Sequence, residues 1–128
     1  MRLLLDTHAF LWWVADDPRL PERARAAIAA GDNEIFFSAA SAWEIAIKSG
    51  LGRVEVPEPL AEFINGQLYA NAFEALPVHV RHAAAVATLP DVHKDPFDRM
   101  LIVQAIEEGM TLITGDKQIS GYGAEVVW

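Results

Sequence analysis

The sequence predicts an α/β fold in which a mostly parallel sheet is covered by helices on both faces. The first observation behind this prediction is that short apolar runs alternate with stretches of helical periodicity along almost the whole chain. The second is that no linker, repeat or low-complexity tract interrupts this alternation. Sheets of this kind place their ligand sites outside the carboxyl ends of the strands. We therefore expect the functional residues where strands end.

The strands are predicted from short, nearly continuous apolar runs, the pattern of strands that are buried on both faces. The first is Leu3-Leu4-Leu5, preceded by Arg2 and followed directly by an acid. Four further runs follow at intervals that leave room for crossover helices. The predicted strands are Arg2–Leu5, Glu34–Phe37, Ala75–Val78, Thr111–Ile113 and Glu125–Val127.

The helices are predicted from apolar residues at helical spacing, and their ends from proline and glycine. Pro21 and Pro96 suit the first turn of a helix, whereas Gly31, Gly50 and Gly109 follow helical runs where a left-handed cap is expected. The predicted helices are His8–Ala15, Pro21–Ala30, Ala39–Ser49, Pro59–Ala70, Val80–Thr88 and Pro96–Glu108.

Length and composition limit the class of protein. A chain of 128 residues, with 52% hydrophobic and 22% charged residues, is predicted to form one domain over residues 1–128 and not a disordered segment. No apolar run approaches the roughly 20 residues that cross a bilayer, and the first residues do not form a signal peptide. Because there is no cysteine, any metal must bind oxygen or imidazole ligands. We expect the cytoplasm as the compartment.

Two aspartates directly follow predicted strands. Asp6 ends the run Leu3-Leu4-Leu5, and Asp116 follows Thr111–Ile113 after two intervening residues. Each has an ordinary explanation, because short acids at strand ends often cap the next helix or form a turn. Both nevertheless lie at the edge of the sheet where ligands bind in this class of fold.

Two further acids lie on the inward faces of predicted helices. Glu44 belongs to the only polar stripe of Ala39–Ser49, and a buried carboxylate must be paired or coordinated. A pair with Lys48, four residues later, is the simpler explanation. Asp98 lies on the stripe of Leu101, at the third position of a helix that Asp95 caps.

One divalent-cation site would explain all four acids together. Mg²⁺ and Mn²⁺ prefer carboxylate and water oxygens, and clustered acids repel one another unless cations neutralise them. Two divalent cations carry four positive charges and would reduce the net charge of −8 to −4, so the acidity does not exclude a nucleic-acid substrate. Two such cations could activate a water and stabilise the leaving oxygen of a phosphodiester.

These motifs resemble those of the PIN-domain family, specifically its VapC-type toxins from bacterial and archaeal toxin–antitoxin pairs. The resemblance spans nearly the whole chain and rests on four segments in the family's order. They are Leu3-Leu4-Leu5-Asp6-Thr7-His8, Ser41-Ala42-Trp43-Glu44-Ile45, Asp95-Pro96-Phe97-Asp98-Arg99 and Leu112-Ile113-Thr114-Gly115-Asp116.

The resemblance implies a PIN-like three-layer α/β/α sandwich with a five-stranded, mostly parallel sheet, and a Mg²⁺- or Mn²⁺-dependent endoribonuclease. Asp6, Glu44, Asp98 and Asp116 match the family's metal ligands, and Thr114 matches a hydroxyl that orients water. The alternatives are a PIN domain that only binds partners, and a phospho-receiver-like signalling module. The latter needs adjacent acids after the first strand, whereas Asp6 stands alone.

Partners follow in part from the residues and in part from the resemblance. Trp12 and Trp13 are adjacent on a helix and point about 100° apart, so they cannot share one pocket. With the resemblance, this predicts a small antitoxin partner, which inserts an arginine among the acids, and a homodimer. The basic residues expected to contact RNA are Lys48, Lys94, Arg99 and Lys117, and the four histidines are expected to be ordinary polar residues.

Overall fold

The computed structural model describes residues 1–128 and contains a five-stranded parallel sheet with strand order β3-β2-β1-β4-β5. This confirms the predicted fold class. The central strand β1 pairs with β2 on one side and with β4 on the other, so that Leu5 lies beside Phe37 and Ile113. The strands are β1 (Arg2–Leu5), β2 (Glu34–Ser38), β3 (Glu74–Leu76), β4 (Thr111–Ile113) and β5 (Val126–Val127).

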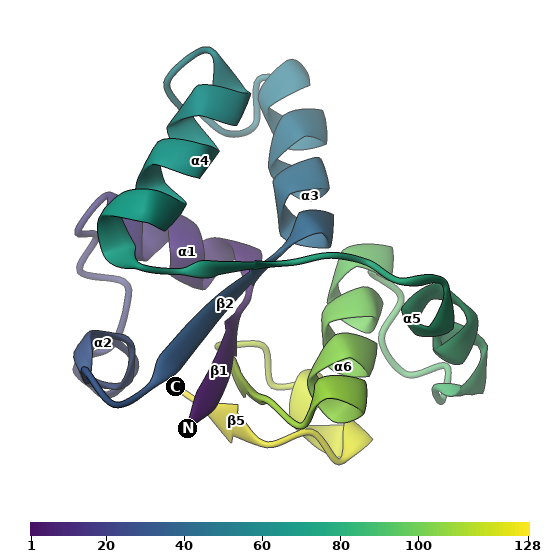
Figure 1. The fold of residues 1–128 in the computed structure, drawn as a ribbon. Coiled ribbons are helices and arrows are strands. Elements are labelled where there is room, and N and C mark those ends of the chain that lie inside the picture. Colours follow the sequence, from purple (N-terminus) through teal and green to yellow (C-terminus); the bar gives the residue numbers. More distant parts are fainter.

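Six α-helices and two short 3-10 helices surround the sheet (Figure 1). The α-helices are α1 (Thr7–Val14), α2 (Glu22–Ala29), α3 (Ala39–Gly50), α4 (Leu60–Asn71), α5 (Val80–Ala85) and α6 (Pro96–Glu108), and the 3-10 helices are η1 (Val86–Thr88) and η2 (Ile119–Tyr122). None of these helices combines the length and the apolar character that a membrane span requires.

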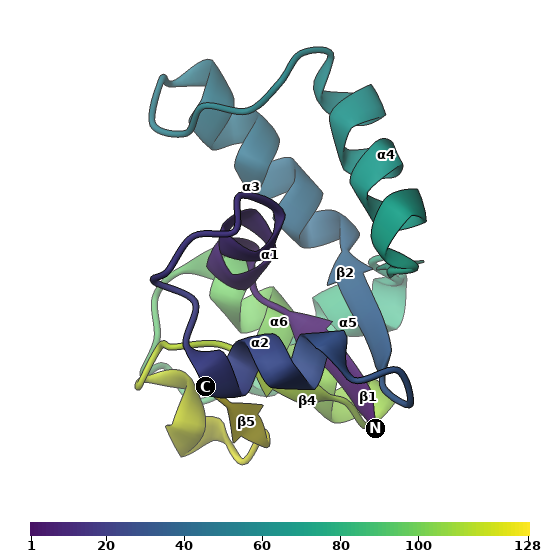
Figure 2. The same ribbon diagram turned by 90° about the vertical axis from the view of Figure 1, so that its left-hand side faces the viewer.

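The sheet separates two apolar cores because successive side chains of a strand point to opposite faces. Leu3 and Leu5 pack with α1 and α2, whereas Leu4 packs with α6 on the other face. Leu3, Leu4 and Leu5 are all fully buried. Seen from the side, α3 and α4 rise together beyond the end of the sheet (Figure 2). The carboxyl ends of β1 and β4 therefore lie at the same end of the sheet as α3 and α4.

The helix ends follow the predictions only in part. Pro96 is the first residue of α6, and Gly109 ends this helix in the left-handed conformation (φ 64°) as expected. The predictions for Gly31 and Gly50 are wrong: the chain leaves α2 through an extended residue, and α3 continues through Gly50. Ala72 (φ 55°) is instead the left-handed cap of α4. Left-handed caps form where the chain must turn back at once, and composition alone does not show where this happens.

Two other boundaries differ for local reasons. β3 ends at Leu76 because Pro77 lacks an N–H for the strand ladder. The helix predicted for residues 80–88 is divided into α5 and the 3-10 helix η1. The 3-10 helix η2 was not predicted, because it has only four residues, one of them Gly121, and just one of them, Ile119, is fully buried.

Candidate active site

A cleft of about 590 Å³ opens at the carboxyl ends of β1 and β4. Three of the predicted acids line it, and they come from three different parts of the chain. Asp6 follows β1, Asp98 lies in the first turn of α6, and Asp116 follows β4. The cleft also contains one basic residue and three ring side chains: its lining is Asp6, His8, Trp12, Arg19, Asp98, Gly115, Asp116 and Trp128.

Asp6 both caps a helix and lines the cleft. Its Oδ1 accepts the Ala9 N–H at 2.7 Å, which satisfies a free donor at the start of α1. Burial raises the pKa of Asp6, against the opposing effects of the Thr114 hydroxyl and the Ala9 N–H. Asp6 therefore caps α1 and lines the cleft at the same time.

Asp98 lies where several negative charges converge. Burial is the main cause that raises its pKa to about 7, and the charge of Asp95 is the next. Glu44 and Asp6 raise the pKa further, and His93 opposes them. A carboxyl group with this pKa is partly protonated at neutral pH, as expected for an acid cluster without cations.

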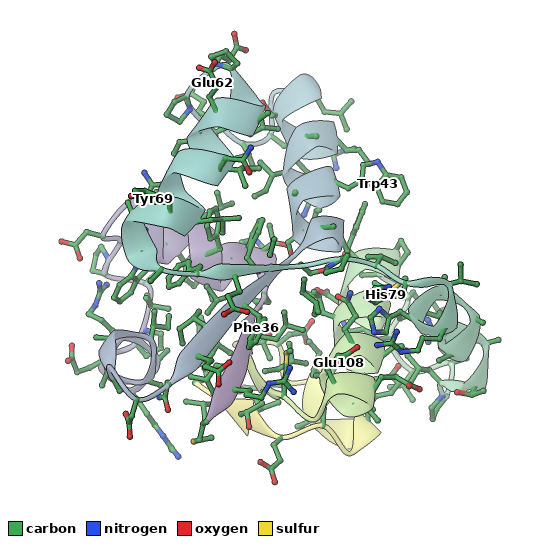
Figure 3. All side chains as sticks on the ribbon, in the orientation of Figure 1. Phe36, Trp43, Glu62, Tyr69, His79 and Glu108 are labelled. Atoms are coloured by element: carbon green, nitrogen blue, oxygen red, sulfur yellow. The ribbon has the colours of Figure 1, made fainter.

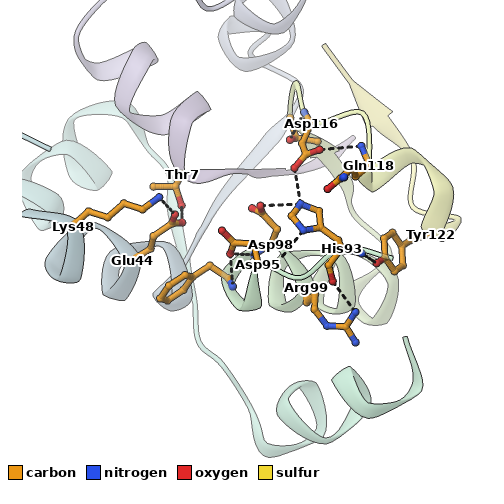
Figure 4. Close-up of polar contacts among 12 residues, drawn as sticks. Thr7, Glu44, Lys48, His93, Asp95, Asp98, Arg99, Asp116, Gln118 and Tyr122 are labelled. Atoms are coloured by element: carbon orange, nitrogen blue, oxygen red, sulfur yellow. Dashed lines mark hydrogen bonds and ion pairs between the residues drawn. The ribbon is translucent and has the colours of Figure 1, made fainter. Parts of the chain in front are cut away.

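His93 occupies the space between two of the acids (Figure 4). Its Nε2 lies 2.6 Å from Asp116 Oδ2 and 3.2 Å from Asp98 Oδ2, and its Nδ1 accepts the Asp95 N–H at 3.1 Å. Because Nδ1 is an acceptor, the proton of the neutral ring is on Nε2, which points at the carboxylates. The expectation that His93 is an ordinary polar residue is therefore wrong. In the sequence, His93 could have been recognised by its position two residues before Asp95, the first acid of the Asp95–Asp98 motif. Its spacing from the other histidines is not helical and gave no indication of this role.

Asp116 is held by its own turn. Its backbone N–H donates to Thr114 Oγ1 at 3.1 Å, and its Oδ1 accepts the Gln118 N–H at 2.9 Å. Thr114 is buried. The second carboxylate oxygen, Oδ2, faces His93. These contacts fix both the backbone and the carboxylate of the residue after β4.

Glu44 does not line the cleft that the other three acids share. Its Oε1 accepts the Thr7 hydroxyl at 2.6 Å, and its Oε2 pairs with Lys48 Nζ (Figure 4). The simpler explanation from the sequence, a Glu44–Lys48 pair, is thus present in the structure. Glu44 still acts on the site electrostatically, since its charge raises the pKa of Asp6 and Asp98.

Two neighbouring residues have structural roles. Asp95 is the N-cap of α6 and its Oδ1 accepts from the Phe97 and Asp98 N–H groups, at 2.8 and 3.2 Å. Arg99 was expected to contact RNA, but its guanidinium donates to backbone carbonyls of the segment before α6, including those of Pro90 and His93. It therefore holds in place the loop that carries His93.

The donor set of the cleft fits a divalent cation. Asp98 and Asp116 offer carboxylate oxygens that lie within 4.8 Å of each other and of a ring nitrogen of His93. Asp6 adds a third carboxylate to the same cleft. His93 Nε2 donates to the carboxylates of Asp98 and Asp116 and is therefore not counted as a ligand. Carboxylate oxygens suit Mg²⁺ and Mn²⁺.

Comparison with known proteins gives a consistent picture. The sequence pattern of the PIN domain matches residues 3–125. Ribonuclease VapC22 of Mycobacterium tuberculosis is 31% identical over 121 residues, which cover 94% of this chain and 91% of that protein. Ribonuclease VapC16 of the same organism is 42% identical over 52 residues, which cover 41% of this chain and 37% of that protein.

Solved structures share the fold at low sequence identity. VapBC2 from Rickettsia felis, bound to a DNA fragment from its promoter, has a TM-score of 0.73 at 16% identity and covers 98% of this chain and 97% of that one. FitAB bound to IR36 DNA has a TM-score of 0.68 at 19% identity and covers 97% of this chain and 92% of that one.

Proposed function

Because this chain belongs to the PIN-domain family, in its VapC branch, we propose that it is a divalent-metal-dependent endoribonuclease and the toxin of a toxin–antitoxin pair. The observation that carries the proposal is the convergence of Asp6, Asp98 and Asp116 on one cleft. The raised pKa of Asp98 also supports it. Burial and the neighbouring negative charges disfavour the charged form of Asp98, and a bound cation would favour that form again. The name of the relative VapC22, a ribonuclease, supports RNA as substrate.

We assign the roles as follows. Asp6, Asp98 and Asp116 would hold Mg²⁺ or Mn²⁺, which would activate a water and neutralise the scissile phosphate. Glu44 does not line the cleft, and it would become a metal ligand only by giving up its ion pair with Lys48. Thr114 accepts a hydrogen bond from the Asp116 N–H and would orient a water. His93 Nε2 would hold the carboxylates of Asp98 and Asp116 close together when no metal is bound.

A small protein partner would occupy the groove beside the cleft. This groove, of about 640 Å³, lies between α1 and α4 and joins the cleft through His8, Trp12 and Arg19. Its apolar lining includes Leu11 and Phe63. An antitoxin could bury apolar side chains here and extend an arginine into the acids, where a guanidinium can replace a cation.

A homodimer would use a different surface. Trp43 projects from α3 with 65% of its surface exposed, and its ring packs edge-on against Phe97 at 5.4 Å (Figure 3). An apolar groove lined by Trp43, Val78, Phe97 and Met100 lies beside it. Exposed apolar surface of this kind marks protein interfaces.

Cleavage of single-stranded RNA by the purified chain tests the nuclease proposal. We expect cleavage with Mg²⁺ or Mn²⁺, none with EDTA, and a loss of about 100-fold or more for Asp6→Asn, which keeps the helix cap. Asp32→Asn, an exposed acid far from the cleft along the strands, is the matched control and should retain full activity. Cleavage that survives both EDTA and Asp6→Asn would contradict the proposal.

Expression in a bacterial host tests the toxin role separately. The wild-type chain should arrest growth, Asp98→Asn should not, and co-expression of the cognate antitoxin should restore growth. If the chain cuts RNA in vitro but is harmless in its native host, the nuclease proposal would be supported and the toxin role would be wrong.

A further inference from the structure

One wall of the cleft is aromatic, and the metal-site roles do not use it. Trp12 and Trp128 both line the cleft that holds the acids. Their ring centroids lie 5.9 Å apart with the planes inclined by 46°, and the His8 ring lies 5.6 Å from Trp12. Both indoles are only partly buried, so each keeps surface open to a ligand.

Both indoles are fixed to the segments that carry the acids. Trp128 follows β5, and its ring lies directly over Gly115. A Cβ at this position would come within 2.5 Å of the indole. Because residue 115 is a glycine, the ring rests on the backbone just before Asp116. Trp12 belongs to α1, the helix that Asp6 caps.

The cleft also contains a cation at its aromatic side. The Arg19 guanidinium lies 4.9 Å from the centre of the Trp12 ring and pairs with Asp17. Two thirds of the Arg19 side chain is exposed. Positive charge beside an aromatic face is the combination found where proteins bind single-stranded nucleic acids.

We propose that Trp12 and Trp128 form a stacking site for a base of single-stranded RNA, next to the phosphate that a cation on the acids would hold. This inference rests on the proposed nuclease function. A phosphate on a cation held by Asp6 and Asp116 would place its nucleoside near the aromatic wall of the same cleft, and Arg19 would contact a neighbouring phosphate. Bases in a duplex are already stacked, so the site selects unpaired RNA.

Binding by a cleavage-deficient form tests the stacking site. In the Asp98→Asn background with Mg²⁺, short oligomers of adenosine and uridine should quench tryptophan fluorescence and bind. An oligomer of base-free ribose phosphates, which has the same charge, should bind about tenfold more weakly and cause little quenching. This comparison needs no substitution at either tryptophan.

Substitutions then locate the site. Trp128→Ala should weaken RNA binding by about tenfold and leave binding of the base-free oligomer unchanged, because the lost contact is to the base. Trp128→Phe keeps an aromatic face and should retain most of the affinity, with less quenching. Trp12→Leu should resemble Trp128→Ala. Tyr69→Ala, which removes an exposed aromatic from α4, is the matched control and should bind as the parent does.

The outcomes separate this inference from the nuclease proposal. Equal affinity for RNA and for the base-free oligomer would overturn the stacking site, even if the wild type cuts RNA. If RNA quenches tryptophan fluorescence in a base-dependent way but the wild type cuts no RNA, the stacking site would be supported and the nuclease proposal would be wrong. If the tryptophan variants bind RNA normally but escape inhibition by the antitoxin, these residues belong to a protein interface and the inference is wrong.

Discussion

At Asp98, burial and neighbouring charge act in the same direction. The Asp98 side chain is 24% exposed, and the pKa of its carboxyl group rises from an ordinary value of 3.8 to about 7. The folded protein therefore holds a proton on Asp98 in a pH range where the unfolded chain has lost it. Between pH 3.8 and about 7, this residue makes the metal-free fold less stable as the pH rises.

Replacing Asp98 tests this at the level of stability. Without metal, Asp98→Asn should match the wild type near pH 4 and be more stable at pH 8 by on the order of 2 kcal/mol, because asparagine carries no charge. Its amide oxygen can still accept from His93. Urea unfolding in EDTA at several pH values measures the difference, with Asp32→Asn, an exposed aspartate, as the control. Equal stabilities at pH 8 would show that the charge of Asp98 is not costly.

The sequence indicated the acids of the cleft but not the residues between them. Asp6 and Asp116 could be predicted because a parallel sheet brings strand ends to one edge. His93 could not, since it reaches Asp116 from a loop whose course is fixed by Arg99 and by a bond from its own N–H to the Tyr122 hydroxyl. Trp128 was missed for a similar reason: its contact with Gly115 depends on how β5 pairs with β4.

Among the elements, α6 shows most directly how local sequence defines a helix. Asp95 caps it, Pro96 begins it and Gly109 ends it in the left-handed conformation. All three features were predicted from residue type. The cap also has an electrostatic effect, because the charge of Asp95 is the second largest cause of the raised pKa of Asp98.

Two substitutions at Asp95 separate these effects. Asp95→Asn keeps a good cap and removes the charge, so the pKa of Asp98 should fall while stability stays close to that of the wild type. Asp95→Ala also removes the cap and should cost about 1 kcal/mol. NMR titration of the Asp98 carboxyl carbon and thermal unfolding measure the two quantities. A pKa of Asp98 that is the same in Asp95→Asn and the wild type would contradict the electrostatic role.

For the whole molecule, the alternation of strands and helices was enough to predict a parallel sheet, because crossover helices impose it. The strand order and the division of the apolar residues into two cores depend on contacts between distant segments. The sequence likewise gave no reason to prefer Trp43 as an exposed residue over Trp12 and Trp13. In the structure Trp13 packs near Phe73 and donates to Asn71.

Trp43 provides a test of the homodimer. Trp43→Glu should weaken self-association by at least about tenfold, because it places a charge at the centre of the apolar surface. The fold should be little affected, since most of the ring is exposed. Light scattering over a concentration series measures the oligomeric state, and Tyr69→Glu on α4 is the matched control. A wild type that is monomeric at high concentration would exclude this interface.

The position of β1 at the centre of the sheet has a consequence for the growing polypeptide on the ribosome. Of the five strands, β1 comes before the others in the sequence and needs partners on both sides, and its second partner, β4, comes from residues 111–113. Asp6 cannot meet Asp116 until that late strand is in place. Asp6, Glu44 and Asp98 are therefore synthesised before the cleft can assemble, because that cleft also needs the segment of β4 and Asp116.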